Sequence, residues 1–177
     1  MKENQLNTIS NAIRDIPDFP KKGIIFKDIT TLLNDAALFA QSVDLLEELV
    51  KDYSFDAIAA IESRGFIFGS VLAYKMGINF VPIRKPGKLP AETVSEEYDL
   101  EYGTDRVEIH ADALEEGQNV LLVDDLLATG GTAQASCKLI ERLGAKVETV
   151  LFLVELGFLK GRNLLKEYNV LSLISYT

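Results

Sequence analysis

The sequence predicts an α/β protein in which a mostly parallel sheet carries helices on both faces. Two observations predict it. Short apolar runs such as 56–61 (DAIAAI) and 120–123 (VLLV) are typical of strands that are buried on both faces. Longer segments between these runs carry apolar residues three and four positions apart, which is the period of an amphipathic helix. Because strands that alternate with helices join in parallel, we expect a single α/β domain over residues 1–177.

Two helices are predicted before the first buried strand. The first has apolar residues at helical spacing and ends at the turn-prone residues 17–20 (PDFP). The second begins at a capping residue, either Asn34 or Asp35. The apolar stripe of the first helix consists of Leu6, Ile9, Ile13 and Ile16, and that of the second consists of Leu38, Phe39, Val43, Leu46, Leu49 and Val50.

The rest of the chain follows the same alternation. Thr132 can cap the helix that follows residues 120–123, and Gly144 suits the left-handed position after its last turn. Residues 85–112 interrupt the pattern with polar, Gly- and Pro-rich sequence, which predicts an inserted mobile flap over approximately 85–111. The other predicted elements are strand 56–61, helix 66–76 ending at Gly77, strand 80–84, strand 147–154, a short helix near 159–168, and strand 170–175.

Composition limits the classes of function. The formal net charge of −9 argues against nucleic acid or an anionic membrane as the main partner, because either would need a basic face. No apolar run approaches the ~20 residues of a membrane span, and the N-terminus lacks an apolar signal core, so we expect a cytoplasmic protein. The single cysteine, Cys137, is expected to pack in the structure, and the single histidine, His110, to lie at the surface or an edge. We expect no zinc site.

Residues 120–132 (VLLVDDLLATGGT) predict a site for a phosphorylated sugar. Asp124 and Asp125 follow the strand, where ligands of open α/β sheets bind, and carboxylates there can accept hydrogen bonds from a vicinal diol. Small residues then precede a helix N-terminus, whose backbone N–H groups and dipole favour an anion. These candidate phosphate-binding residues are Ala128, Thr129, Gly130, Gly131 and Thr132.

Three other interpretations of this segment are weaker. A P-loop NTPase would need a G-x-x-x-x-G-K-[S/T] element, which the sequence lacks. A dinucleotide-binding turn would need G-x-G-x-x-G, and the adjacent Gly130 and Gly131 do not have that spacing. An ordinary turn without a ligand would leave two carboxylates at a buried strand without partners, which is costly.

The segment 120–132 resembles the phosphoribosyl-diphosphate-binding motif of type I phosphoribosyltransferases, and within that family it is most similar to the members that act on adenine. The resemblance extends, in the family's order, to 19–28 (FPKKGIIFKD), 62–66 (ESRGF), 84–90 (RKPGKLP) and 100–103 (LEYG). It implies the type I phosphoribosyltransferase fold, with a small base-binding hood over approximately residues 1–34 and a flap. It also implies a homodimer, in which Arg84 and Lys85 are candidates to reach the partner's site.

The resemblance implies a reaction as well: adenine and 5-phosphoribosyl 1-diphosphate give AMP and diphosphate in purine salvage. Mg²⁺ would be carried with the substrate diphosphate, without a dedicated protein cage. Glu101 and Tyr102 would lie near the reacting centre, and Arg64 and Lys88 would stabilise the leaving group. The resemblance assigns diphosphate binding to Glu62, Ser63, Arg64, Arg84, Lys85 and Lys88, with a cis peptide at Glu62–Ser63, and adenine binding to Ile25, Phe26, Lys27 and Leu126.

Two alternatives remain open at this point. A phosphoribosyltransferase for another purine would share the phosphate-binding segment and differ in the hood. A non-catalytic regulator would bind phosphoribosyl diphosphate as a signal, and such a protein usually has an additional nucleic-acid-binding surface. The net acidity of the chain and the presence of Glu101, Tyr102 and Lys88 argue against the regulator.

Overall fold

The structure is a computed structural model that describes residues 2–19, 21–99 and 103–177. Contacts within the chain divide it into two compact units, Met1–Glu48 and Leu49–Thr177. In the described part of the chain, no helix is both long and apolar enough to cross a membrane.

The first unit holds three helices and a two-stranded antiparallel sheet: α1 (Lys2–Ala12), β1 (Arg14–Pro17), β2 (Ile25–Asp28), α2 (Thr30–Leu33) and most of α3 (Ala36–Val50). The predicted cap of α3 is confirmed, because the Asp35 carboxylate accepts hydrogen bonds from the N–H groups of Ala37 and Leu38 at 3.0 Å each. The short helix α2 has no counterpart in the sequence prediction.

The predicted extent of the first helix is wrong. The helix ends at Ala12, and Ile16 lies in β1, where it pairs with Phe26 of β2. Pro17 gives the physical reason, because a proline ring disfavours the helical conformation for the residue before it. Ile9 and Ile13 are buried as the apolar spacing predicted.

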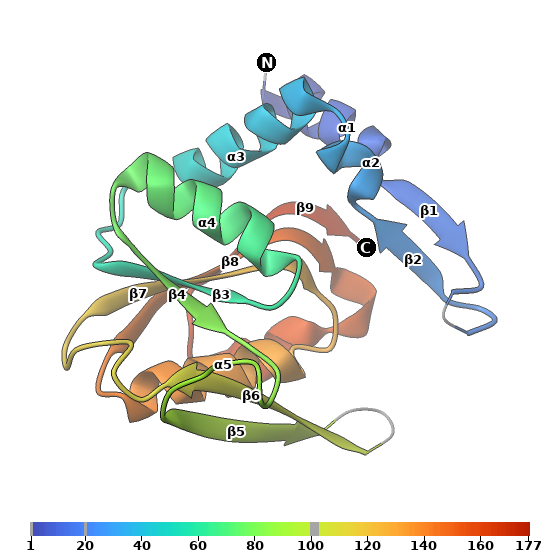
Figure 1. The fold of residues 1–177 in the computed structure, drawn as a ribbon. Coiled ribbons are helices and arrows are strands. Elements are labelled where there is room, and N and C mark those ends of the chain that lie inside the picture. Colours follow the sequence, from blue (N-terminus) through green and yellow to red (C-terminus); the bar gives the residue numbers. More distant parts are fainter. Residues whose placement is uncertain (1, 20, 100–102) are drawn as a thin grey trace. The chain divides into compact units, whose positions relative to one another are not determined.

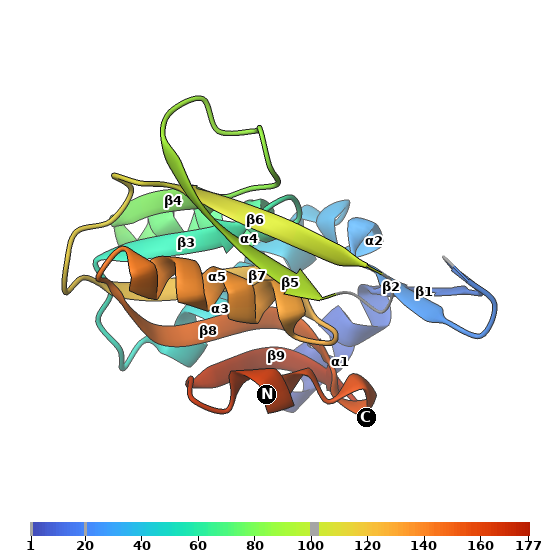
Figure 2. The ribbon, with the colours of Figure 1, turned by 90° about the horizontal axis from the view of Figure 1, so that it is seen from below.

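The second unit is built on a five-stranded sheet with the order β4-β3-β7-β8-β9, whose neighbouring strands pair in parallel (Figure 1). Helices α4 and α5 lie on opposite faces of this sheet, which confirms the predicted fold class (Figures 1 and 2). The bounds of these elements are β3 (Ala57–Ile61), α4 (Gly65–Met76), β4 (Asn79–Ile83), β7 (Asn119–Leu127), α5 (Gly131–Arg142), β8 (Lys146–Leu156) and β9 (Val170–Tyr176).

The inserted segment after β4 forms an antiparallel hairpin of β5 (Thr93–Asp99) and β6 (Thr104–His110), which lies beside α5 (Figure 2). Between β8 and β9, the short helix predicted near 159–168 is two 3-10 helices, η1 (Gly157–Leu159) and η2 (Gly161–Leu165). Gly77 and Gly144 both have the predicted left-handed conformation after their helices, with φ of 67° and 86°.

The central strands carry the core of the second unit. Every residue of β3 is buried, and so are residues 120–123 of β7, as their apolar runs predict. Cys137 of α5 is fully buried in the same core, which confirms its packing role, and burial raises the pKa of its thiol well above the usual range. His110 is half-buried at the end of β6, as expected for an edge position. This rigid core fixes the carboxyl ends of the parallel strands.

Candidate active site at the carboxyl ends of the parallel strands

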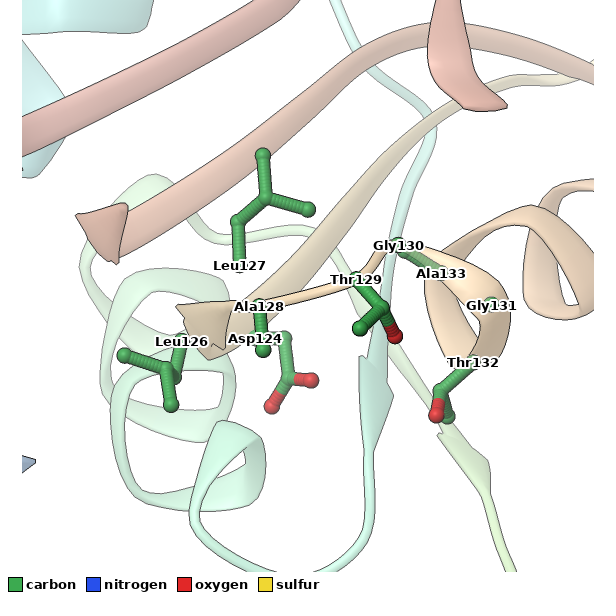
Figure 3. A pocket seen from close by; sticks show the side chains of 9 residues that line it. All are labelled: Asp124, Leu126, Leu127, Ala128, Thr129, Gly130, Gly131, Thr132 and Ala133. Atoms are coloured by element: carbon green, nitrogen blue, oxygen red, sulfur yellow. The ribbon is translucent and has the colours of Figure 1, made fainter. Parts of the chain in front are cut away.

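The turn from β7 to α5 surrounds a pocket (Figure 3). The side chains of Asp124, Leu126, Thr129 and Thr132 point to one side of this turn, whereas Leu127 points to the other (Figure 3). The pocket is lined by Asp124, Leu126, Leu127, Ala128, Thr129, Gly130, Gly131, Thr132 and Ala133. All five predicted phosphate-binding residues, Ala128 to Thr132, therefore line one pocket, and a carboxylate lies at its edge.

The helix after this turn begins one residue before Thr132, so the prediction that Thr132 caps it is wrong. Gly130 occupies the N-cap with φ of 89°, and it has no side chain that could cap the helix. The first intrahelical bond runs from the N–H of Gln134 to the carbonyl oxygen of Gly130, at 2.9 Å. Thr132 instead lies in the first turn of α5 and lines the pocket. The N–H groups of residues 131–133 precede the first helical bond and can bind an anion.

The two adjacent carboxylates have different surroundings. Strand β7 continues to Leu127, so both residues lie within the strand, where neighbouring side chains point to opposite faces. Asp124 lines the pocket, and burial together with the adjacent charge of Asp125 raises its pKa well above the usual value. The side chain of Asp125 is only 6% exposed and accepts a hydrogen bond from Nε of Arg64 at 2.6 Å. Asp124 is therefore the better placed of the two to meet a ligand in this pocket.

The turn from β3 to α4 packs directly against β7. The Glu62–Ser63 peptide is cis, as the resemblance implied. A Cβ added to Gly65 would lie 2.8 Å from Oδ1 of Asp124 and 3.0 Å from the carbonyl oxygen of Val123. Only glycine allows this approach, so Gly65 and the Arg64–Asp125 ion pair fix the two turns side by side. The sequence does not reveal this pairing, because Arg64 and Asp125 are 61 residues apart.

The predicted diphosphate-binding residues Arg84 and Lys85 have partners within the chain. Nε and a terminal nitrogen of Arg84 donate to the two carboxylate oxygens of Glu62 at 3.1 and 3.0 Å, and this pairing holds the pKa of Glu62 below its usual value despite burial. Nζ of Lys85 pairs with Asp105 and with the hydroxyl of Tyr98 in the β5–β6 hairpin. Burial lowers the pKa of Lys85, but the interactions with Asp105 and Tyr98 raise it by more, so the net shift of the pKa is upward.

Two further candidates for the diphosphate, Ser63 and Lys88, have exposed side chains. The carbonyl oxygen of Lys88 accepts a hydrogen bond from Arg84 at 3.0 Å. This bond ties the start of the inserted segment to the β3–α4 turn through Arg84. The predicted catalytic residues Glu101 and Tyr102 lie outside the described residues.

Three of the predicted adenine-binding residues lie together in β2. The ring of Phe26 packs edge-to-face on Phe19, with centroids 5.2 Å apart, and Nζ of Lys27 lies 2.6 Å from Asp15. Ile25 is 53% exposed, so the apolar sequence of this segment does not form a core strand. Leu126, in the second unit, lines the pocket of the β7–α5 turn.

The parallel sheet and the glycine-rich turn beside Asp124 lie in a region of the chain that matches a known family. Residues 28–173 match the phosphoribosyl transferase domain family. The chain belongs to this family, and the resemblance inferred from its motifs is confirmed.

Relatives that are similar to the chain over nearly its whole length include adenine phosphoribosyltransferases. An adenine phosphoribosyltransferase from Caldanaerobacter subterraneus is 58% identical over 171 residues, which cover 97% of this chain and 99% of the relative. The crystal structure of adenine phosphoribosyltransferase from Thermoanaerobacter pseudethanolicus is similar with a TM-score of 0.95 and 59% identity, over 97% of this chain and 99% of that one. The enzyme from Saccharomyces cerevisiae, complexed with an imino-altritol bisphosphate and adenine, has a TM-score of 0.91 and 40% identity, with the same coverage.

Proposed function

We propose that this protein is an adenine phosphoribosyltransferase, which transfers the 5-phosphoribosyl group from 5-phosphoribosyl 1-diphosphate to adenine and releases AMP and diphosphate. The observation that carries the proposal is the β7–α5 turn, where a pocket lined by backbone N–H groups lies beside the Asp124 carboxylate. Relatives 57–59% identical over nearly the whole chain bear the name of this enzyme.

In the proposed complex, the β7–α5 turn binds the phosphoribosyl part of the substrate. Backbone N–H groups of residues 128–132 and the hydroxyls of Thr129 and Thr132 donate to the 5-phosphate, which also meets the positive end of the α5 dipole. Asp124 accepts hydrogen bonds from the ribose hydroxyls. Asp125 orients Arg64 through their ion pair, and it is the second candidate for a ribose hydroxyl although it does not line the pocket.

The proposed diphosphate site is the β3–α4 turn, with Glu62, Ser63 and Arg64. Arg64 presents a planar fork of donors, and Lys88 lies on the exposed segment that follows β4. Arg84 and Lys85 would join this site only by exchanging their present carboxylate partners, Glu62 and Asp105, for the oxygens of the diphosphate.

We propose that Mg²⁺ enters with the diphosphate, because this ion keeps several waters and binds through substrate phosphates and one or two carboxylates. Asp124, which lines the pocket of the neighbouring β7–α5 turn, is the carboxylate that could contribute to its binding. When bound, the ion would neutralise charge on the diphosphate.

Catalysis in this proposal is positioning and charge stabilisation. As the bond between C1 of ribose and the diphosphate oxygen breaks, positive charge develops on the ribose and negative charge on the leaving group. Arg64 and Lys88 stabilise the departing diphosphate, and the turns hold the ribose in line with the base. Glu101 and Tyr102, in the flap, would act near the reacting centre.

The proposed adenine site uses the backbone of β2. A carbonyl oxygen and an N–H group near Ile25 and Lys27 match the donor N6 and the acceptor N1 of adenine, whereas a 6-oxopurine presents the opposite pattern. Phe26 is the aromatic residue proposed to pack on the adenine ring, and Leu126 is the fourth residue assigned to the base. We propose that residues 1–34 form a hood and 85–111 a flap within one domain, and that the protein acts as a homodimer.

A base-panel assay tests this function. Steady-state turnover is measured with adenine, hypoxanthine and guanine at saturating phosphoribosyl diphosphate and Mg²⁺. We expect adenine to be preferred by ~10⁴ or more, because a 6-oxo group facing a carbonyl leaves a buried acceptor unpaired. Comparable efficiency on hypoxanthine would assign the enzyme to another purine. Tight binding of phosphoribosyl diphosphate without turnover of any base would favour a regulator.

A further inference from the structure

The connection between β8 and β9 packs against the β7–α5 turn, which we call the phosphate turn, and the two meet at Gly161 and Gly130. A Cβ on Gly130 would lie 2.5 Å from the carbonyl oxygen of Gly161, at the start of η2. Conversely, a Cβ on Gly161 would overlap the carbonyl oxygen of Ala128 and lie 3.0 Å from Cδ1 of Leu127. The two backbones therefore meet with no room for a side chain on either, and Gly161 is itself buried.

The connection is in turn fixed to the sheet by Arg162. Nε and one terminal nitrogen of Arg162 donate to the two carboxylate oxygens of Glu155 at 2.6 and 2.7 Å, and Glu155 is buried at the end of β8. The guanidinium also donates to the carbonyl oxygen of Val170 at 2.8 Å and to Oγ of Ser172 at 3.0 Å, both on β9. Arg162, which directly follows Gly161, thus fixes the connection to both β8 and β9.

A second bond fixes η2 to the helix that begins at the phosphate turn. Nε2 of Gln134, in the first turn of α5, donates to the carbonyl oxygen of Leu164 at 3.0 Å. The β8–β9 connection therefore contacts the β7–α5 turn at Ala128 and Gly130, and it is bonded to the first turn of α5. A phosphate site made of backbone N–H groups cannot adjust by side-chain rotation, so its geometry depends on this support.

We propose that Gly161, held in place by the Arg162–Glu155 ion pair, is a positioning residue that sets the backbone of the phosphate turn for the 5-phosphate. The proposal rests on the proposed function, which assigns the 5-phosphate to residues 128–132. Neither Gly161 nor Arg162 lines the pocket, so their effect reaches the ligand only through the turn.

Calorimetry with AMP and adenosine tests this role. The dissociation constant of adenosine divided by that of AMP isolates the contribution of the phosphate. In Gly161→Ala we expect that ratio to fall about tenfold or more, since a small displacement of a binding group is costly. Adenosine affinity should stay close to that of the wild type. Thermal unfolding of each variant is followed in parallel.

Gly157→Ala is the matched control, because it lies in the same connection but its Cβ would lie 3.3 Å from the carbonyl oxygen of Tyr176, away from the turn. It should keep the wild-type ratio. Arg162→Gln should lower the ratio, and Arg162→Lys should restore part of it, because lysine keeps the charge and loses the two-pronged hydrogen bond.

The variant Gly130→Val separates the two proposals. If it lowers the ratio while Gly161→Ala and Arg162→Gln leave the ratio unchanged, the phosphate site stands and the positioning role is overturned. If even Gly130→Val keeps the wild-type ratio, the phosphate has been assigned to the wrong turn and both proposals fall. A lower melting temperature with an unchanged ratio in Gly161→Ala would also overturn the positioning role.

Discussion

The β3–α4 and β7–α5 turns follow neighbouring parallel strands and present opposite chemistry. The β3–α4 turn carries charged side chains, with Glu62 bound to Arg84 and Arg64 bound to Asp125. The β7–α5 turn has no charged side chain over residues 128–132, and it offers backbone N–H groups at the start of a helix. The first can exchange ion-pair partners, whereas the second is fixed by close packing.

This difference suits two parts of one substrate. A phosphate that stays bound as a monoester throughout the reaction gains from a rigid site of backbone donors. A diphosphate that must leave gains from side chains that can move and release it. We therefore expect substitutions in the β7–α5 turn to weaken the binding of AMP, and substitutions in the β3–α4 turn to weaken the binding of diphosphate.

The largest effect is expected for Gly130→Val. A branched side chain would collide with the carbonyl oxygen of Gly161 and would be strained at φ of 89°, so the turn must change its shape. We expect AMP affinity to fall by about 100-fold or more in calorimetry, while inorganic diphosphate binds as in the wild type. Native-like AMP affinity would show that this turn does not hold the 5-phosphate.

A smaller loss is expected for Asp124→Ala and Asp125→Ala, with the fold retained. Loss of a charged acceptor should cost about 1.5–3 kcal/mol in kcat/KM for phosphoribosyl diphosphate. Asp124→Ala removes a carboxylate that lines the pocket, whereas Asp125→Ala also removes the Arg64–Asp125 ion pair. Circular dichroism controls for folding, and unchanged steady-state kinetics in both variants would contradict the ribose assignment.

The reverse selectivity is expected for Arg64→Lys. Lysine keeps the charge but cannot present two parallel donors, so we expect the affinity for diphosphate to fall about tenfold and the affinity for AMP to change little. Competition binding against phosphoribosyl diphosphate measures both. An equal loss for AMP and diphosphate would mean that the two turns act as one site, and the comparison would fail.

The smallest effect concerns stability and pH. Arg84 holds the pKa of Glu62 below the usual 4.5 despite burial, so the charged pair stabilises the folded chain above about pH 4.5, and this contribution is lost as pH falls through the folded-state pKa. We expect Glu62→Gln to lower the free energy of unfolding by about 1 kcal/mol at neutral pH. Urea unfolding should show the difference shrinking as pH falls below 4.5. A difference independent of pH would exclude this cause.

The class of protein and most of the elements could be predicted from sequence because their signals are local. The apolar run 120–123 with the two aspartates and glycines after it predicted a strand, a ligand-binding edge and a helix N-terminus. The structure has the strand and the helix, with a pocket at the turn between them, and phosphate binding at that turn stays a prediction. The motif order predicted the phosphoribosyltransferase family, which the comparisons confirm. The local prediction failed at Ile16 and at Thr132. Ile16 pairs with Phe26 in a strand instead of continuing the helix, and a left-handed Gly130 takes the N-cap position that was predicted for Thr132.

By itself, the sequence determined most of the helices and strands of the second unit, and which residue types are available to bind phosphate, since periodicity, capping and glycine conformation act over a few residues. Only the tertiary structure decided how these residues are engaged. It paired Arg64 with Asp125 across 61 positions and brought Gly161 against Gly130. The physical reason is that such partners meet through packing of separate strands on one sheet, and a local pattern carries no information about which distant backbone will arrive there.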